Sequence, residues 1–262
     1  MVPVVSLVAD LGESFGPYTM GDDAALLELV TCANIACGFH AGDPRVMDAT
    51  VRRCAQRGVE VGAHPSFPDL VGFGRRAMEL SAEEVRTDVL YQIGALSAFA
   101  RAHGTRVTHV VPHGKLGNLV GERADYAGAL ADAITAFDPS LVLGVTAGVM
   151  QDLAEQRGLA TAVVGAVDRA YTDAGTLVPR SQPGAVLDDV DQIVQRTVRM
   201  VVDGTVESIS GRPVPVEVDA VLLHGDGPHA LDAAAKIRSA LAEAGVQLVG
   251  MSEVVRAEGG RA

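Results

Sequence analysis

Aromatic side chains are scarce in this chain, and tryptophan is absent. Phe, Trp and Tyr make up 4% of its 262 residues, which argues against a stacking platform for sugars or single-stranded nucleic acid. Positive charge is scarce too, because 21 Lys and Arg stand against 33 Asp and Glu, a net charge of −12. Nucleic acids and anionic membranes are bound through basic surfaces, so we expect neither as a partner.

Cysteine is rare, and Cys32, Cys37 and Cys54 form no C-x-x-C pair. We expect three reduced, buried thiols, as in a cytoplasmic protein. The first nine residues lack the basic start of a secretory signal, and the longest nearly apolar run, residues 141–150, is half of a membrane span. We therefore expect a cytoplasmic location without a membrane segment.

Common motifs for nucleotide binding and hydrolysis are missing as well. Gly114-Lys115 lacks the upstream glycine and the following Ser or Thr of a phosphate-binding loop, and no G-x-G-x-x-G follows a strand. H-E-x-x-H, G-x-S-x-G and zinc-type Cys/His spacings do not occur. We therefore do not expect this chain to bind ATP through either nucleotide motif.

The sequence does contain a regular alternation of short apolar runs with helical patterns. Helix signals include Asp43-Pro44 before a stop at Gly58, and the capping box Ser81–Glu84. The count favours a closed or nearly closed β/α barrel, with a doubly wound open sheet as the alternative. We expect one domain over residues 1–255 and a frayed tail over 256–262. Runs typical of buried parallel strands occupy residues 4–9, 34–39, 59–62, 107–111, 141–145, 161–167, 220–223 and 246–249.

Ionisable residues directly follow many of these runs. The carboxyl ends of parallel strands meet at one mouth of a barrel, so we expect five of these residues to line one cavity. They are Asp10, His40, His64, His113 and His224. Two more carboxylates, Glu13 and Asp168, complete the catalytic candidates. Of the other histidines, His103 is assigned to a helix end, His109 to a structural place within a strand and His229 to a helix start.

Two chemistries are open for these candidates. Asp10 with His40 and His64 could hold one divalent metal ion, because carboxylate and imidazole are common ligands. The histidines could equally carry protons, since imidazole titrates near neutral pH. Glycines beside the candidates, such as Gly12 and Gly114, would let backbone amides approach an oxyanion or a phosphate.

Short motifs surround the candidates in a fixed order. They are Asp10-Leu11-Gly12-Glu13, ANIACGFHAGD (33–43), GAHPSFPD (62–69), Phe73-Gly74-Arg75, YQIGAL (91–96), Pro112-His113-Gly114, Asp168-Arg169, LVPRS (177–181) and LHGD (223–226). Together they resemble the LamB/YcsF family, the lactam-utilisation proteins that form the A component of 5-oxoprolinase, over roughly residues 4 to 250. So many motifs in one order make the resemblance specific.

The resemblance implies an irregular seven-stranded β/α barrel of the glycoside hydrolase/deacetylase type. It implies opening of the lactam 5-oxo-L-proline to L-glutamate, with ATP hydrolysed to ADP and phosphate, in a complex with partner subunits B and C. ATP would serve the complex, with the kinase step left to a partner. A homo-oligomer remains open. Substrate binding would fall to residues near the catalytic candidates: Asn34, Gly114, Lys115, Arg169, Arg180 and Asp226.

The chain departs from the family pattern at three positions. The family has a lysine before Pro-His-Gly, a tyrosine before the next asparagine and a glutamate before Asp-Arg, where this chain has Val111, Gly117 and Val164. Lys115 could supply the missing cation from the adjacent loop, since its stem is long and flexible. Two alternatives therefore stay open: a metal-dependent deacetylase-like hydrolase that acts alone, and a diverged, non-catalytic lactam-binding subunit.

Overall fold

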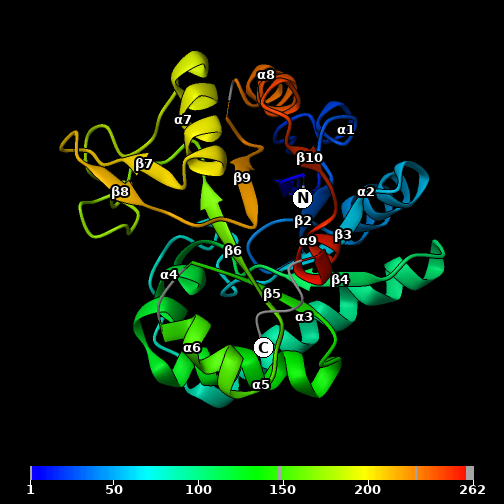
Figure 1. The fold of residues 1–262 in the computed structure, drawn as a ribbon. Helices are drawn as coiled ribbons and strands as arrows, with labels where there is room; N and C mark the ends of the chain where they lie inside the picture. The colour runs from blue at the N-terminus through cyan, green and yellow to red at the C-terminus, as the bar shows by residue number, and fades with distance from the viewer. Residues whose placement is uncertain (1, 147–148, 228, 258–262) are drawn as a thin grey trace.

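Seven parallel strands close into a barrel in the computed structural model, which describes residues 2–146, 149–227 and 229–257 (Figure 1). Each strand pairs with the next, and the last of them, β9, pairs with β1 and closes the ring. This closure confirms the predicted seven-stranded barrel and excludes the open sheet. The strands are β1 (Val4–Leu11), β2 (Cys32–Ala36), β3 (Glu60–His64), β4 (Val107–Val110), β5 (Val142–Val145), β6 (Thr161–Ala166) and β9 (Ala220–His224).

Alternate residues of each strand point into the barrel, as the pleat of a strand requires. Part of the interior is an apolar cluster formed by Val8, Cys32, Val111, Val142, Ala162, Val164, Ala220, Leu222 and Met251. Strand register then aligns Asp10 with His224 on one side and with Asn34 on the other, and Asn34 aligns through Gly62 with His109. The register itself therefore brings these polar residues together on adjacent strands.

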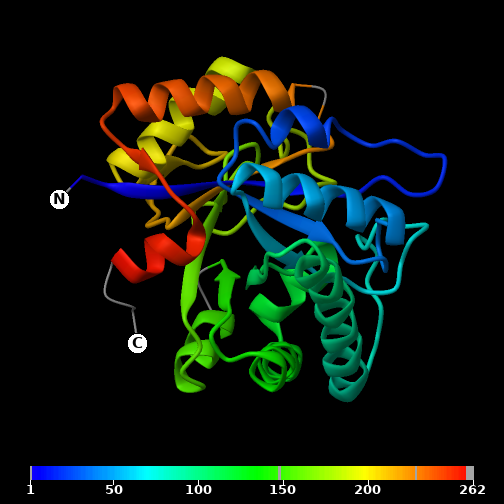
Figure 2. The ribbon, with the colours of Figure 1, turned by 90° about the vertical axis from the view of Figure 1, so that its right-hand side faces the viewer.

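Helices cover the outside of the barrel (Figure 2). The predicted signals are confirmed at α2, where the Asp43 side chain accepts from two backbone amides and Gly58 ends the helix with φ 68°. The capping box of Ser81 and Glu84 starts α3. The helices are α1 (Asp23–Leu26), α2 (Pro44–Arg57), α3 (Ala82–Ala102), α4 (Gly114–Glu122), α5 (Ala124–Phe137), α6 (Val149–Gln156), α7 (Val190–Val202), α8 (Ala230–Glu243) and α9 (Met251–Ala257), and a hairpin of β7 (Thr205–Glu207) and β8 (Pro213–Pro215) follows α7.

One predicted strand ends earlier than expected. The run 34–39 was predicted to be extended, but β2 stops at Ala36. The chain turns at Gly38, which has φ 95° and donates its amide to Ala41 O at 2.9 Å. A positive φ costs glycine little, so the turn forms there and leaves His40 in a loop instead of directly behind a strand.

The last helix lies at the end of the barrel where β1 begins (Figure 2). A short strand, β10 (Gln247–Leu248), pairs with the start of β1 and leads into α9. Arg256 and Ala257, predicted to be part of a frayed tail, belong to α9, while 258–262 lie outside the described residues. Among the described helices, none has the length and apolar character needed to span a membrane.

Candidate active site

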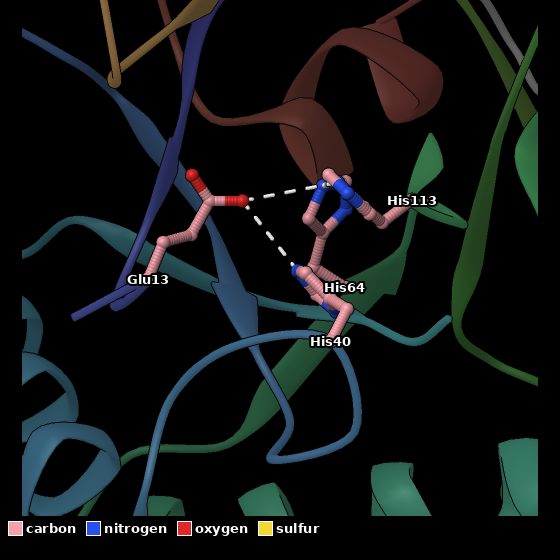
Figure 3. A group of neighbouring side chains, drawn as sticks. All are labelled: Glu13, His40, His64 and His113. Atoms are coloured by element: carbon pink, nitrogen blue, oxygen red, sulfur yellow. Dashed lines mark hydrogen bonds and ion pairs between the residues drawn. The ribbon is translucent and has the colours of Figure 1, made fainter. Parts of the chain in front are cut away.

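Four buried side chains meet at the carboxyl ends of the first four strands (Figure 3). Glu13 follows β1, His40 lies in the loop after β2, His64 ends β3, and His113 is the N-cap residue of α4. Glu13 Oε1 is 3.5 Å from His40 Nε2 and 3.8 Å from His113 Nδ1. His40 stacks on His113 with ring centroids 3.9 Å apart. We call these four residues the Glu–His cluster.

Two main-chain carbonyls fix the hydrogens of the His64 and His113 rings. His64 Nδ1 lies 2.6 Å from Val111 O, and His113 Nε2 lies 2.8 Å from Phe73 O. A carbonyl oxygen only accepts, so each of these nitrogens carries a hydrogen and donates it. The remaining nitrogens, His64 Nε2 and His113 Nδ1, are 3.0 Å apart. In two neutral rings their lone pairs would face each other, so this contact requires a cation, either a proton or a metal ion.

The surroundings disfavour an added proton on the His113 and His40 rings. Burial, with His64 close by, lowers the pKa of His113 to about 3. Burial and the neighbouring His113 and His64 hold the pKa of His40 well below its usual value. Burial, with Asp10 and Asp226 nearby, raises the pKa of Glu13 well above its usual value. The surroundings therefore disfavour the charged forms of Glu13, His40 and His113, as expected of a site whose ligand atoms bind a cation.

The Glu–His cluster could hold a metal ion, since its ligand atoms all lie within 4.8 Å of one another. Among the described residues, Glu13 Oε1 and both ring nitrogens of His40 have no hydrogen-bond partner. The separations of 3.0, 3.5 and 3.8 Å bracket the ~3.3–3.4 Å edge of a tetrahedron with bonds of ~2.0–2.1 Å. A proton between His64 and His113 would leave Glu13 and His40 unsatisfied, so the residues fit a metal ion better.

The membership of this group differs from the metal set expected from the sequence, which stays a prediction. Glu13 and His113 join His40 and His64, whereas Asp10 lies beside the group. Asp10 Oδ1 accepts from Asn34 Nδ2 at 2.9 Å and lies 3.4 Å from His64 Nε2. Burial works to raise the Asp10 pKa, but His64 and Asn34 hold it below its usual value. Asp10 thus provides a fixed negative charge next to the His64 ring.

A carboxylate–histidine pair stands next to the cluster. His224 Nδ1 lies 2.8 Å from Asp168 Oδ1, and the His224 amide donates to Asp168 Oδ2 at 3.2 Å. Burial opposes charge on both groups, but their attraction outweighs it, so the pKa of His224 is raised and that of Asp168 is lowered. Because His224 is the register partner of Asp10, this pair borders the same site.

Three arginines surround the site and differ in their partners. Arg75 Nη2 donates to Asp226 Oδ2 at 3.1 Å. Arg169 is buried, and its Nε and Nη2 donate to two main-chain carbonyls of the 178–185 loop. Arg180 has no hydrogen bond to another described residue, and burial with the charge of Arg75 lowers its pKa. Arg169 therefore anchors a loop, which leaves Arg75 and Arg180 as the cations available to an anionic group.

Gly114 and Lys115 pack against the loop that follows β3. A Cβ at Gly114, where φ is 56°, would come within 2.6 Å of Gly74 O. The Lys115 amide donates to the same carbonyl at 2.8 Å. The Lys115 ammonium forms no ion pair with another described residue, and the side chain is half-buried. Its predicted role as a replacement cation stays a prediction.

The two valines that replace charged residues of the family lie close together. Val111 and Val164 both point into the barrel and are 7% exposed. A Cβ at Gly144 in β5 would be 2.6 Å from Val111 and 3.1 Å from Val164, so the two side chains approach the same point from the strands on either side of β5. This proximity supports the interpretation that a lysine and a glutamate were lost as a pair.

Sequence reasoning missed the carbonyls that orient the rings and one of the arginines. Phe73 has φ 54°, a rare conformation for a bulky residue, and its carbonyl accepts from His113. Residue types carry no information on where a main-chain carbonyl points. Arg75 does stand within the Phe73-Gly74-Arg75 motif, which was a signal for its role.

The closed ring of seven parallel strands defines a class of fold, the irregular β/α barrel of the glycoside hydrolase/deacetylase type. Peptidoglycan deacetylase PdaC from Bacillus subtilis shares this fold, with a TM-score of 0.53 at 17% identity over 98% of this chain and 92% of that chain. The LamB/YcsF family model matches residues 5–256, and the chain belongs to the LamB/YcsF family.

Two relatives show how far the similarity extends. The chain is 47% identical over 253 residues to the A component of 5-oxoprolinase from Pyrococcus horikoshii, which covers 96% of this chain and 99% of the relative. It superposes on the crystal structure of the lactam utilization protein from Thermus thermophilus with a TM-score of 0.90 at 46% identity, over 94% and 99% of the two chains. The similarity therefore covers both partners almost completely.

Proposed function

We propose that this chain is the ring-opening subunit of an ATP-dependent 5-oxoprolinase, which converts 5-oxo-L-proline to L-glutamate. The observation that carries the proposal is the Glu–His cluster, whose Glu13 and His40 atoms lack partners among the described residues at the mouth of the barrel. Buried polar atoms without partners are costly and indicate a site that is completed by a ligand. The relatives named for the A component of 5-oxoprolinase supply the reaction.

Different residues of the site serve different steps of the lactam hydrolysis. Water adds to the ring carbon that carries the phosphoryl group, and a second water later splits the resulting γ-glutamyl phosphate into L-glutamate and phosphate. Between these two additions the C–N bond breaks and the ring nitrogen takes up a proton. His224, held by Asp168 and with a raised pKa, gives that proton from Nε2, since its Nδ1 faces the carboxylate. Arg75 and Arg180 bind the anionic groups of the substrate. A divalent metal ion bound by the Glu–His cluster would supply Lewis acidity and lower the pKa of a coordinated water.

The activation of the lactam is assigned to partner subunits, B and C, in the cytoplasm. A lactam carbonyl is a poor electrophile, and transfer of the ATP γ-phosphoryl group to its oxygen makes the carbon reactive. This chain has neither nucleotide motif, so a partner performs that step and the barrel hydrolyses the product. The competing proposal, which the loss of charge at Val111 and Val164 leaves open, is a non-catalytic lactam-binding subunit.

The test is release of glutamate from 5-oxoproline and ATP by the reconstituted complex. We expect turnover only with the partner subunits present. Glu13→Gln, which removes the carboxylate charge without changing its size, lowers kcat by at least about a hundredfold. The exposed Glu79, which pairs with Arg123, provides the matched control Glu79→Gln, and its kcat stays within about twofold. Turnover unchanged in Glu13→Gln would favour the non-catalytic subunit.

A further inference from the structure

A second group of polar residues lies inside the barrel, below Asp10. Asn34 Oδ1 is 3.2 Å from His109 Nε2, and His109 Nδ1 is 2.9 Å from Thr108 Oγ1. Thr108 Oγ1 is in turn 3.3 Å from Glu60 Oε2, which accepts the amide of Ser252 at 3.1 Å. These contacts join Asp10 at the mouth to helix α9 at the opposite end of the barrel. We call Asn34, His109, Thr108 and Glu60 the interior column.

The hydrogens of the interior column can be placed without ambiguity at its upper end. Asn34 Nδ2 donates to Asp10 Oδ1 at 2.9 Å, so the Asn34 amide turns its NH₂ group to Asp10 and its oxygen to His109. His109 Nε2 must then carry a hydrogen to donate to that oxygen. The His109 ring is neutral, because burial lowers its pKa to about 4, and its Nδ1 accepts from the Thr108 hydroxyl. The orientations are thus fixed from Asp10 to Thr108, whose single hydroxyl hydrogen goes to His109, and Glu60 adjoins Thr108 by contact.

The fold makes room for this column at specific points. A Cβ at Gly62 would lie 2.0 Å from His109 Nε2, and a Cβ at Gly250 would lie 2.4 Å from Glu60 Oε1. The pairing of β3 with β4 also shifts by one residue, since Val61 aligns with Val107 but Gly62 aligns with His109. Such a bulge redirects side chains, and here it lets Thr108 and His109 both take part in the column.

The interior column differs from the Glu–His cluster in that its polar atoms are satisfied. Glu60, His109 and Cys32 lie close enough to suggest a second metal group. However, Glu60 accepts from Ser252, His109 is bonded at both nitrogens, and Cys32 Sγ accepts the Met251 amide at 3.1 Å. Each of these three residues therefore already has hydrogen-bond partners within the protein, and none indicates a missing ligand. The Asn34 amide does not readily lose a proton, so the interior column orients its neighbours and does not conduct protons.

We infer that Asn34, held by His109 and Thr108, is a positioning residue that aims the Asp10 carboxylate at His64. The inference rests on the proposed function, since it concerns the geometry of the same site. Asp10 Oδ1 lies 3.4 Å from His64 Nε2, the nitrogen without a hydrogen, so its charge favours the cation that Nε2 and His113 Nδ1 require; Asn34 is the hydrogen-bond donor to Asp10 from the strand beside it. Partners of this kind behind a site typically contribute about 10- to 100-fold to activity or metal affinity.

The first test measures kcat and KM of His109 variants in the reconstituted complex. We expect His109→Leu to lower kcat by about 10- to 100-fold and to leave KM within about threefold, because the column does not reach the substrate. His109→Gln, whose amide nitrogen can replace Nε2 as a donor, restores kcat to within about threefold. Val142→Ala, which removes apolar volume from the interior but no hydrogen bond of the column, leaves kcat within about twofold.

A double-mutant cycle with Asp10→Asn separates positioning from a general structural effect. If the column acts through Asp10, His109→Leu causes no further loss of kcat once Asp10 is changed. Equal losses in both backgrounds, or no recovery in His109→Gln, would overturn the inference.

Crystal structures of the variants test the inference even if no complex turns over 5-oxoproline. We expect the contact between Asp10 Oδ1 and His64 Nε2, now 3.4 Å, to open beyond ~4 Å in His109→Leu and to persist in His109→Gln. An Asp10 carboxylate that stays in place in His109→Leu would disprove the positioning role. Absent turnover combined with a displaced carboxylate would refute the proposed function alone.

Discussion

Single carbonyl groups decide much of the chemistry at the residue scale. Val111 O and Phe73 O each take one ring hydrogen, and these two bonds turn the free nitrogens of His64 and His113 toward each other. The arrangement gives a histidine pair that demands a cation, although no charged residue was needed to create that demand. Residues close to this pair can therefore change its electrostatics without touching the reacting atoms.

Lys115 is the residue whose role is simplest to test. Lys115→Met keeps the length of the stem and removes the charge. If Lys115 replaces the family lysine lost at Val111, we expect lactam turnover by the complex to fall by about tenfold, through the lost electrostatic interaction. The chain offers its other lysine as the control, since Lys236 pairs with Asp191 and Asp232 on the surface. Equal turnover in Lys115→Met and Lys236→Met would make Lys115 an ordinary surface residue.

The Asp168–His224 pair makes a pH-dependent contribution to stability. The pKa of His224 is raised above its unfolded value of about 6.5, so its contribution is complete below that pH and is lost as pH rises through the raised pKa. The pKa of Asp168 is lowered below about 3.9, so its contribution is lost only as pH falls through that lowered pKa. The pair therefore stabilises the fold most between about pH 4 and 6.5.

His224→Gln tests this dependence through the free energy of unfolding measured in urea at several pH values. We expect the variant to be less stable by about 1–3 kcal/mol near pH 5.5, because a charge-assisted hydrogen bond is lost. The difference from the wild type should shrink as the pH rises above 7. A difference that is constant from pH 5 to 9 would show that His224 is neutral throughout.

At the scale of elements, glycines at inward-pointing strand positions make space for functional side chains. Gly62 faces His109 across β3 and β4, and Gly144 faces Val111 across β4 and β5. In each case the neighbouring strand carries a larger residue into the space that a side chain would have filled. A strand glycine in this barrel is therefore part of the packing of its neighbour.

Gly62→Ala should be costly for this reason. Its Cβ would overlap the His109 ring, so we expect a loss of about 1–3 kcal/mol in the free energy of unfolding. Gly94, in the middle of α3 with open space around its Cβ position, is the matched control. Gly94→Ala should raise stability by ~0.5–1 kcal/mol, since alanine favours the helix. Similar effects at both positions, measured by urea unfolding, would contradict this account.

The strands and the gathering of histidines were predictable, because burial and position after a strand leave a direct record in the sequence. His40, His64 and His113 do meet at the mouth. The place of Glu13 beside the three histidines was not predictable, since it depends on how the backbone turns after Leu11. His109 was assigned a structural place, but its link to Asn34 depends on a bulge that no periodicity reveals.

Charge and fold together set the expected behaviour of the whole molecule. A net charge of −12 repels polyanions at long range. We expect the isolated chain to show no binding of micromolar ATP in calorimetric titration, whereas the complex with its partner subunits hydrolyses ATP when 5-oxoproline is present. Micromolar binding by this chain alone would move the activation step into the barrel.

The strands of the barrel are synthesised in an order that affects folding. β1 leaves the ribosome before the other strands of the barrel, yet one of its edges is completed only when β9 and β10 have been synthesised. Asp10 and His224, neighbours in the folded site, therefore meet only after the strands between them have been made, and such long-range pairing slows folding. Until then the half-made barrel exposes an open strand edge, the feature that makes nascent chains prone to aggregate. Expression at reduced temperature should accordingly favour the folded protein over inclusion bodies.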